Sequence, residues 1–326
     1  MRFQAAFAMA LLITAGSSDA RAWGCEGHRA VVFIAERLLP PATLVKARAA
    51  LLAAPIDPAL SRFCDPVPDD PLVDSATWAD DYRAVDASTF DWHFIDLPRG
   101  LGTLTASNTR QFCPHGDCAV DAIVAQFQAL TRPTSTAAVK GSALRYLLHF
   151  IGDLHQPLHA TTNGDRGGNC VPIIYHDRAP QQNPNGDYSP NLHAVWDSNT
   201  IRTLMTKRGL ADARALARHI ADLRPLPAAV AARPPTQAVV TQWAQGAHDL
   251  GRMLVYPRLP TPIAIEPASA AMLRSCTDNR NVAQRMLAKH EVVDDRYEQA
   301  SIPAIVGQLR LAGIRLAATL NAAFPN

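Results

Sequence analysis

Apolar residues recur with the three- and four-residue spacing of amphipathic helices along most of the chain. This pattern predicts helices at 29–39, 42–53, 76–83, 119–130, 135–154, 211–223, 236–255 and 302–324, and a further helix that opens at 191–197. Two segments favour extended structure instead: the aromatic, alternating segment 91–98 and the apolar run 170–175. We therefore expect a mainly α, multi-helix fold with at most one short β-hairpin.

The first residues have the pattern of a secretory signal. Arg2 supplies a positive charge, an apolar stretch runs from Ala5 to Ala15, and small residues follow at Ala20 and Ala22. The apolar stretch is too short to anchor the chain in a bilayer. We expect cleavage of residues 1–22 after Ala22, which leaves Trp23 at the mature N-terminus. Because most later connections are short, residues 23–326 are expected to form a single domain.

Composition narrows the class of protein. The chain has 326 residues, 48% of them hydrophobic, which is sufficient for a large globular core. Its formal net charge is only +2 and it has no long basic run, so a broad basic face for nucleic acid is not indicated.

Six cysteines fit export to an oxidising compartment, either a periplasm or the exterior. Cys113 and Cys118 enclose a short loop and form the best local disulfide candidate. The other four cysteines are Cys25, Cys64, Cys170 and Cys276. They allow three pairings, and the sequence does not choose among them.

The chemistry centres on segment 149–159. His149 and Asp153 are four residues apart, so a helix places both on one face. Pro157 cannot continue that helix, and His159 therefore lies on a turning segment. His193 and Asp197 repeat the four-residue spacing in a second helix. Imidazole and carboxylate groups delivered together in this way indicate metal binding.

Eight residues lie in motif-like contexts of this kind: His28, Asp80, His93, His149, Asp153, His159, His193 and Asp197. A single tetrahedral zinc ion takes four ligands, so this number suits a multinuclear zinc site with a bridging carboxylate. Magnesium fits less well because it prefers oxygen ligands and keeps its water. Five of the six remaining histidines are interpreted as surface or loop residues: His115, His176, His219, His248 and His290.

These motifs, in this order, resemble the zinc-dependent single-strand nucleases of the S1/P1 family. The segments that carry the resemblance are 23–28 (WGCEGH), 77–80 (TWAD), 92–96 (WHFID), 149–159 (HFIGDLHQPLH), 167–169 (GGN) and 191–197 (NLHAVWD). The central motif is highly specific. The resemblance also implies a fold like that of zinc-dependent phospholipase C.

The resemblance implies three zinc ions with defined ligands. They are divided as Asp80, His93, His149 and Asp153 for one ion, the Trp23 amine and carbonyl with His28 and the bridging Asp153 for a second, and His159, His193 and Asp197 for a third. Ligation by the Trp23 amine would make removal of the signal segment a condition for full metal loading, because an amide nitrogen is a very poor ligand.

Other roles follow from the same resemblance. Asp80, Arg83 and Asp153 are expected to be catalytic, with Arg83 also neutralising phosphate charge. Phe94 would stack on an unpaired base. Further substrate contacts are expected from Asp117, in the small disulfide loop, and from Asn169. Asp96 is expected to support the metal ligands from outside their coordination shell, and His155 to have either this supporting part or a structural one.

The implied activity is hydrolysis of single-stranded DNA and RNA to 5′-phosphate products, with 3′-nucleotidase activity as a further expectation, by a monomer without stable membrane association. One alternative is a zinc-dependent phospholipase C or broad phosphoesterase, although that family ends its last helical pair with glutamate where this chain has Asp197. A second alternative is a non-enzymatic zinc-binding exported protein. The preference between DNA and RNA, base preference and pH optimum remain open.

Overall fold

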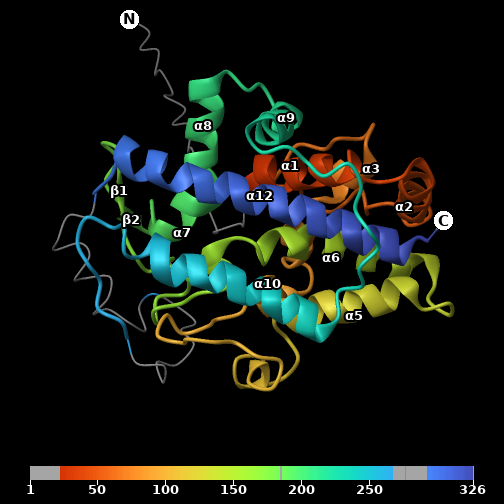
Figure 1. Ribbon diagram of the computed structural model, residues 1–326, viewed down its shortest axis with the longest axis horizontal. Coiled ribbons are helices and arrows are strands. Elements are labelled where there is room, and N and C mark those ends of the chain that lie inside the picture. The colour runs from red at the N-terminus through yellow and green to blue at the C-terminus, as the bar shows by residue number, and fades with distance from the viewer. Residues whose placement is uncertain (1–22, 184–185, 267–275, 277–291, 326) are drawn as a thin grey trace, which may run out of the picture.

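The computed structural model describes residues 23–183, 186–266, 276 and 292–325, and it is mainly α-helical (Figure 1). The predicted signal segment lies outside the described residues. The helices are α1 (Gly24–Glu36), α2 (Pro41–Leu52), α3 (Pro71–Ser75), α4 (Trp78–Tyr82), η1 (Ala87–His93), η2 (Thr109–Gln111), α5 (Ala119–Thr131), α6 (Ala137–Asp153), η3 (Pro157–His159), α7 (Leu192–Ala194), η4 (Val195–Asn199), α8 (Thr200–Arg208), α9 (Ala213–Leu223), α10 (Gln237–Leu250), η5 (Gly251–Val255) and α12 (Asp295–Ala323).

Helix α6 lies at the centre of the core. Every residue from Ala143 to Asp153 is buried, so this part of the helix is covered on all sides rather than on one face. Helices α5, α2 and α12 pack against it, and α1 packs between α12 and α9. The long α12 runs across the molecule with α10 beside it (Figure 1). The motif at the end of α6 is therefore held in the most enclosed part of the fold.

Side-chain caps explain where several helices begin. Thr136 accepts a hydrogen bond from the backbone N–H of Val139 at the start of α6, and Thr236 does the same for Val239 at the start of α10. Both satisfy backbone donors that a helix start leaves unpaired. Helix α6 ends at Asp153, and Pro157 begins the separate turn η3. The predicted break before His159 is confirmed.

One helical and one extended segment differ in their bounds from the prediction. Helix α12 begins at Asp295 rather than near 302, because Asp294 caps it and Pro303 is accommodated inside it. Residues 91–93 belong to the 3-10 helix η1, so the extended segment starts only at Phe94. Apolar alternation over so few residues does not distinguish the two conformations.

The described residues contain four two-residue strands: β1 (Ile174–Tyr175), β2 (Gln181–Gln182), β3 (Tyr188–Ser189) and β4 (Val292–Val293). Strands β2 and β3 form the short hairpin that the sequence allows. Strands β1 and β4 pair in parallel, with Ile174 opposite Val292 and Tyr175 opposite Val293. This second pair was not expected, because its strands lie far apart in the chain.

The six cysteines form three disulfides, one within a short loop and two between distant parts of the chain. The predicted Cys113–Cys118 pair is confirmed, and the four open cysteines pair as Cys25–Cys64 and Cys170–Cys276. Complete oxidation fits a protein that folds in an oxidising, extracytoplasmic setting.

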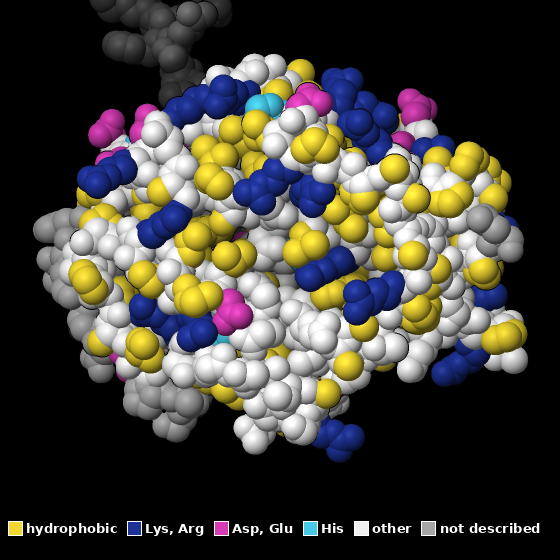
Figure 2. Space-filling model, in the orientation of Figure 1, with side chains coloured by type: hydrophobic (Ala, Val, Ile, Leu, Met, Phe, Trp, Pro, Cys, Tyr) yellow, Lys and Arg dark blue, Asp and Glu magenta, His cyan; other side chains and the backbone are white. Residues whose placement is uncertain are grey.

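Figure 2 shows the face that carries α12 and α10. Lys and Arg side chains are scattered there among apolar ones rather than gathered in one basic stripe. Within the described part of the chain, no helix combines the length and apolar character needed to cross a bilayer.

Candidate metal centre

Asp153, at the end of α6, lies between two sets of histidines. Its Oδ1 is 3.2 Å from Nε2 of His28. Its Oδ2 is 2.9 Å from Nδ1 of His93 and 3.2 Å from Nε2 of His149. Each carboxylate oxygen thus serves a different group of side chains, which is the geometry of a bridging ligand.

Asp80, on the short helix α4, completes the group around His93 and His149. Its Oδ1 lies 3.7 Å from Nδ1 of His93 and 3.7 Å from Nε2 of His149. Nη1 of Arg83, one helical turn later, is 3.7 Å from the same oxygen. Helix α4 therefore delivers both a candidate metal ligand and a guanidinium to the edge of the centre.

A separate group contains His159, His193 and Asp197. The Nε2 atoms of His159 and His193 face each other at 3.0 Å, and Oδ2 of Asp197 is 3.2 Å from Nε2 of His193. Gln156 donates from Nε2 to Oδ1 of Asp197 at 2.5 Å and also accepts from the backbone of Leu158. Sequence reasoning assigned Gln156 no role, although it lies inside the central motif.

Backbone carbonyls orient three of the imidazoles. In each case Nδ1 lies within hydrogen-bond distance of a carbonyl oxygen, and Nε2 faces its group. The pairs are His149 with Ala76 at 2.8 Å, His159 with His93 at 2.8 Å, and His193 with Gly167 at 2.6 Å. A carbonyl at Nδ1 fixes the tautomer that leaves Nε2 free for a metal ion.

Close packing fixes the position of His28. Its ring stacks on His149 with centroids 4.0 Å apart, and it is fully buried. Gly152 lies against the other atoms of the ring, where an added Cβ would be 2.9 Å from Nδ1 of His28. Trp23 is also fully buried, and its indole N–H donates to the carbonyl of Gly152 at 2.7 Å. Trp23, the first described residue, therefore packs beside His28 and the end of α6.

Buried charge dominates the electrostatics of these groups. Burial lowers the pKa of His93 to about 4, although Asp153 opposes it. For His149 burial acts in the same direction, but the charges of Asp153 and Asp80 outweigh it and raise the pKa to about 9. Burial also disfavours the Asp153 carboxylate, yet His149 and the neighbouring histidines hold its pKa well below the usual value. Positive charge on the neighbouring side chains thus favours the ionised form of Asp153.

The donor atoms fit metal ions. The side chains fall into three sets whose ligand atoms lie within 4.8 Å of one another: His28, His149 and Asp153; Asp80, His93 and His149; and His159, His193 and Asp197. Several of these buried atoms have no hydrogen-bond partner among the described residues, including Nε2 of His28 and His149, Oδ1 of Asp153 and Oδ2 of Asp197. Buried polar atoms are normally satisfied, so these orphaned donor sets point to ions.

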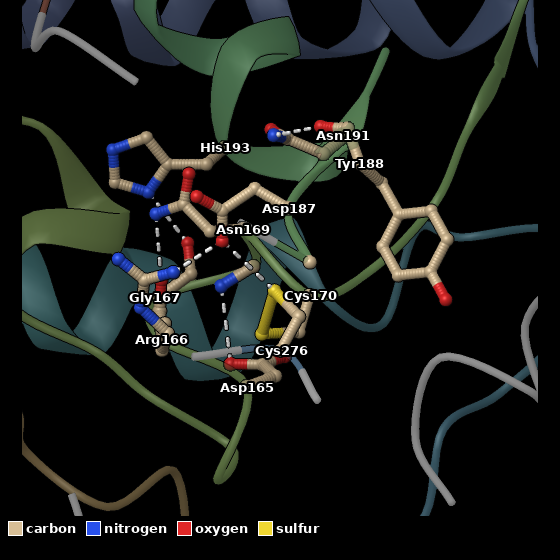
Figure 3. Close-up of a disulfide and its surroundings, with 12 residues drawn as sticks. Asp165, Arg166, Gly167, Asn169, Cys170, Asp187, Tyr188, Asn191, His193 and Cys276 are labelled. Carbon is tan, nitrogen blue, oxygen red and sulfur yellow. Dashed lines mark hydrogen bonds and ion pairs between the residues drawn. A yellow bond between two sulfur atoms is a disulfide. The ribbon is translucent and has the colours of Figure 1, made fainter. Parts of the chain in front are cut away.

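A glycine-rich loop supports the third set (Figure 3). Gly167 provides the carbonyl that orients His193, and Asp165 accepts from the backbone N–H of Gly168 at 3.0 Å. The Cys170–Cys276 disulfide lies beside this loop, and Arg166 forms an ion pair with Asp187 (Figure 3). The loop is therefore held from several sides.

The aromatic side chains near Asp80 remain partly open to solvent. Phe94 is half-buried and packs edge-to-face with Phe90 at 5.8 Å between centroids. Phe90 is 39% exposed, and the guanidinium of Arg83 lies 5.6 Å from its centroid. Asp96 is also half-buried, and burial together with nearby Asp165 and Asp91 raises its pKa to about 7.

The two other expected substrate contacts lie on supporting loops. Asp117 is half-buried between Gly116 and Cys118 in the small disulfide loop. Asn169 is half-buried and donates from Nδ2 to the carbonyl of Arg166 at 2.8 Å, so it holds the shape of the glycine-rich loop.

Two further histidines have structural contacts. Of the two parts expected of His155, these contacts favour the structural one: its Nε2 faces Nη1 of Arg315 at 2.7 Å, and its Nδ1 faces the carbonyl of Ile151. These contacts join the segment after α6 to α12. His248 is fully buried rather than at the surface, with Nε2 3.0 Å from the carbonyl of Leu101. His290 lies outside the described residues.

Gly152→Ala is expected to weaken one metal set. The new methyl group would press on His28, which is fully buried and cannot move aside. Such overpacking costs about 1–3 kcal/mol. We expect one metal ion fewer per chain by elemental analysis and a matching loss of activity. Gly246→Ala, in α10, is the matched control because its Cβ would meet nothing within 4 Å. Equal metal content in the two variants would contradict this account of Gly152.

Comparison with known proteins agrees with this geometry. The family model described as S1/P1 nuclease matches residues 23–325. Endonuclease 2 of Arabidopsis thaliana is 25% identical over 314 residues, which cover 93% of this chain and 90% of the relative. Nuclease S1 of Aspergillus oryzae is 30% identical over 184 residues, or 54% of each chain, and nuclease P1 of Penicillium citrinum is 28% identical over 198 residues, or 60% of this chain and 64% of the relative.

The match extends over nearly all of the chain after residue 22, including every segment that contributes to the three metal-binding sets. S1/P1 nucleases are metal-dependent hydrolases of phosphodiester bonds, which agrees with the orphaned donor atoms. This chain belongs to the S1/P1 nuclease family.

Proposed function

We propose that this protein is an exported, zinc-dependent nuclease that cuts single-stranded DNA and RNA and leaves 5′-phosphate products, with 3′-nucleotidase activity as a related reaction. Residues 23–326 would form its single catalytic domain, acting as a monomer. The observation that carries the proposal is the sharing of Asp153, whose two oxygens face different histidine sets. That arrangement suits a pair of adjacent metal ions.

The donor sets favour zinc. Imidazole and carboxylate ligands suit zinc, whereas magnesium prefers oxygen ligands alone. Asp80, His93, His149 and Asp153 would hold one ion, His28 and Asp153 with Trp23 a second, and His159, His193 and Asp197 a third. When bound, zinc ions would make a water molecule a competent nucleophile near neutral pH and offset charge on the phosphate.

Trp23 would contribute its free amine once residues 1–22 have been removed. Its burial and its hydrogen bond to Gly152 already place it beside His28 and the end of α6. Its own carbonyl accepts from the N–H of Gly27 and so starts α1. Intact mass of the exported protein tests the cleavage, since a chain that begins at any residue other than Trp23 would remove this ligand.

Arg83 would position the scissile phosphate. Its guanidinium is held between Asp80 and the ring of Phe90, close to the donor atoms but not consumed by a bidentate ion pair. Guanidinium groups bind phosphate oxygens through several donors at once and keep their charge at all relevant pH values.

Phe94 and Asp96 would contact the base next to that phosphate. Burial alternates along this segment: Ile95 and Leu97 are buried, whereas Phe94 and Asp96 reach solvent. A partly exposed ring can stack on an unpaired base, and a nearby carboxyl can hydrogen-bond its edge. Asp96 therefore joins Asp117 as a candidate for base recognition, in place of the supporting role that the sequence indicated.

Asn169 and Asp117 are the two remaining residues of the proposed substrate site. Asn169 would act through the glycine-rich loop that holds His193, because its side-chain amide is already engaged with Arg166. Asp117 is partly exposed to solvent, as a residue that contacts substrate directly must be.

One assay tests the proposal. Purified mature protein is incubated with single-stranded DNA, RNA, 3′-AMP and phosphatidylcholine, each with and without a chelator and after zinc is restored. We expect chelator-sensitive release of 5′-nucleotides from both polymers, recovered by zinc. Cleavage of lipid alone would select the phospholipase alternative, and inertness toward every substrate would select the non-enzymatic one. Recovery with magnesium but not zinc would contradict the assigned metal.

A further inference from the structure

A second cluster of metal-ligating side chains lies outside the metal centre, where β1 meets the start of α12 (Figure 1). It contains His176, Asp295 and Glu298, whose ligand atoms lie within 4.8 Å of one another. None of these residues belongs to the three sets around Asp153 and Asp197. The cluster was not expected, because the sequence places His176 about 120 residues from its partners and favours no contact between them.

The parallel strand pair β1–β4 creates this cluster. Tyr175 lies opposite Val293, and the backbone N–H of His176 donates to the carbonyl of Val293 at 3.1 Å. Asp294 then caps α12, so Asp295 and Glu298 occupy its first turn. Helical spacing places these two carboxylates on one side of the helix. The strand register thereby brings an imidazole to the side chains of that turn.

His176 adopts an uncommon backbone conformation, with φ of 51°. Residues other than glycine rarely occupy this left-handed region, and their presence there usually reflects a local requirement. The conformation directs the ring between two carboxylates, with Nε2 3.3 Å from Oε2 of Glu298 and Nδ1 3.8 Å from Oδ1 of Asp295.

Glu298 is the observation that points to an ion. Its side chain is fully buried, and Oε2 accepts no hydrogen bond within the described part of the chain. Its other oxygen, Oε1, accepts from the hydroxyl of Tyr175. A buried carboxylate without a full set of partners carries a large free-energy penalty unless a charge compensates it. A divalent cation between Glu298 and His176 would provide that charge.

The side of the cluster away from α12 is open. A surface pocket of about 480 Å³ lies there, lined by Tyr175, His176, Asp177, Arg178 and Asn199. It leaves room for water molecules to complete the coordination of an ion. The present counter-charge on Asp295 is Lys207 of α8, whose Nζ is 2.9 Å from Oδ1. Lys207 is 43% exposed, so this ion pair is weak and replaceable.

We propose that His176, Asp295 and Glu298 bind one divalent cation of the zinc class at the start of α12, separate from the metal centre. One imidazole and two carboxylates are a donor set typical of zinc and neighbouring transition metals. The ion would join β1 to α12 and stabilise the folded chain, because it binds a site that exists only when both segments are in place.

Metal counting tests this site. Protein equilibrated with zinc buffered in the micromolar range is washed, digested and measured for metal ions per chain, and thermal unfolding is followed with and without added zinc. We expect His176→Asn and Glu298→Gln each to hold one ion fewer than the parent and to lose the zinc-dependent part of the stabilisation. Both variants should cleave nucleic acid at the parental rate. Asparagine is chosen for position 176 because it tolerates the left-handed conformation.

Two further variants make the test specific. His219→Asn, in α9, removes another imidazole from outside the centre and should keep the parental metal count. Lys207→Met removes the competing ammonium group and should tighten zinc binding about two- to fivefold, the range of an exposed ion pair. If His176→Asn keeps the parental count, or if His219→Asn loses as much metal as His176→Asn, the site is refuted. Weaker zinc binding by Lys207→Met would also refute it, because removal of a competing cation from Asp295 should favour zinc at this site.

Discussion

Asp153→Asn is expected to abolish nuclease activity and to release metal from two sets at once. The substitution keeps the size of the side chain but replaces one oxygen by an NH2 group, which is a donor and not a ligand. Since the two oxygens face His28 on one side and His93 and His149 on the other, either orientation of the amide takes an oxygen ligand from one set. The loss of the negative charge weakens cation binding in the other set as well. Loss of an outer partner of a ligand already costs about 10- to 100-fold. We expect a loss beyond about 100-fold for Asp153.

Activity on single-stranded DNA and metal content by elemental analysis check this expectation together. Asp249→Asn is a suitable control, because Asp249 is a partly exposed aspartate in an ion pair with Arg252, outside the metal-binding sets. It should retain its metal and its rate. Full activity in Asp153→Asn would rule out the shared role of this carboxylate, whatever the metal proves to be.

Gly167→Ala is expected to disable the third set while leaving the other two loaded. Gly167 has φ of 59°, and an added Cβ would lie 2.3 Å from the carbonyl oxygen of Leu158, beside His159. A backbone atom cannot rotate away, so the loop itself must shift. Its own carbonyl orients His193, and both histidines of the set would be displaced. We expect a loss of activity of about 10- to 100-fold, with one metal ion fewer.

Gly209→Ala separates the clash from backbone strain. Gly209 ends α8 with φ of 62°, and an added Cβ there meets nothing within 4 Å. Both variants place alanine in the left-handed region, at a cost of about 1–2 kcal/mol each. Gly209→Ala should therefore lose stability in thermal unfolding but keep its metal and its rate. If both variants lose activity equally, strain rather than displacement of the histidines explains the effect.

Local geometry made much of the metal centre predictable. His149 with Asp153 and His193 with Asp197 follow from four-residue helical spacing, and Pro157 explains the turn before His159. Most of the helices were also predictable, because apolar spacing reports burial directly. The resemblance to the S1/P1 nucleases also implied that the separate motifs contribute to one site.

Long-range contacts were not predictable in this way. The burial of His248 depends on the carbonyl of Leu101, and the contact of His155 depends on Arg315. Gln156 supports Asp197, a residue 41 positions away. No short-range pattern encodes these pairs. The early start of α12 has a different origin, since a proline that usually opens a helix is tolerated inside this one.

The shared carboxylate has a consequence for how the protein acquires its metal. A cation that binds on one side of Asp153 changes the charge available to the other side, so occupancy of the two sites is thermodynamically linked and the coupling is reciprocal. The set around Asp197 has its own carboxylate and lacks this link. Metal-free protein titrated with zinc should accordingly display, besides the step proposed for His176, two interdependent binding steps and one that proceeds on its own.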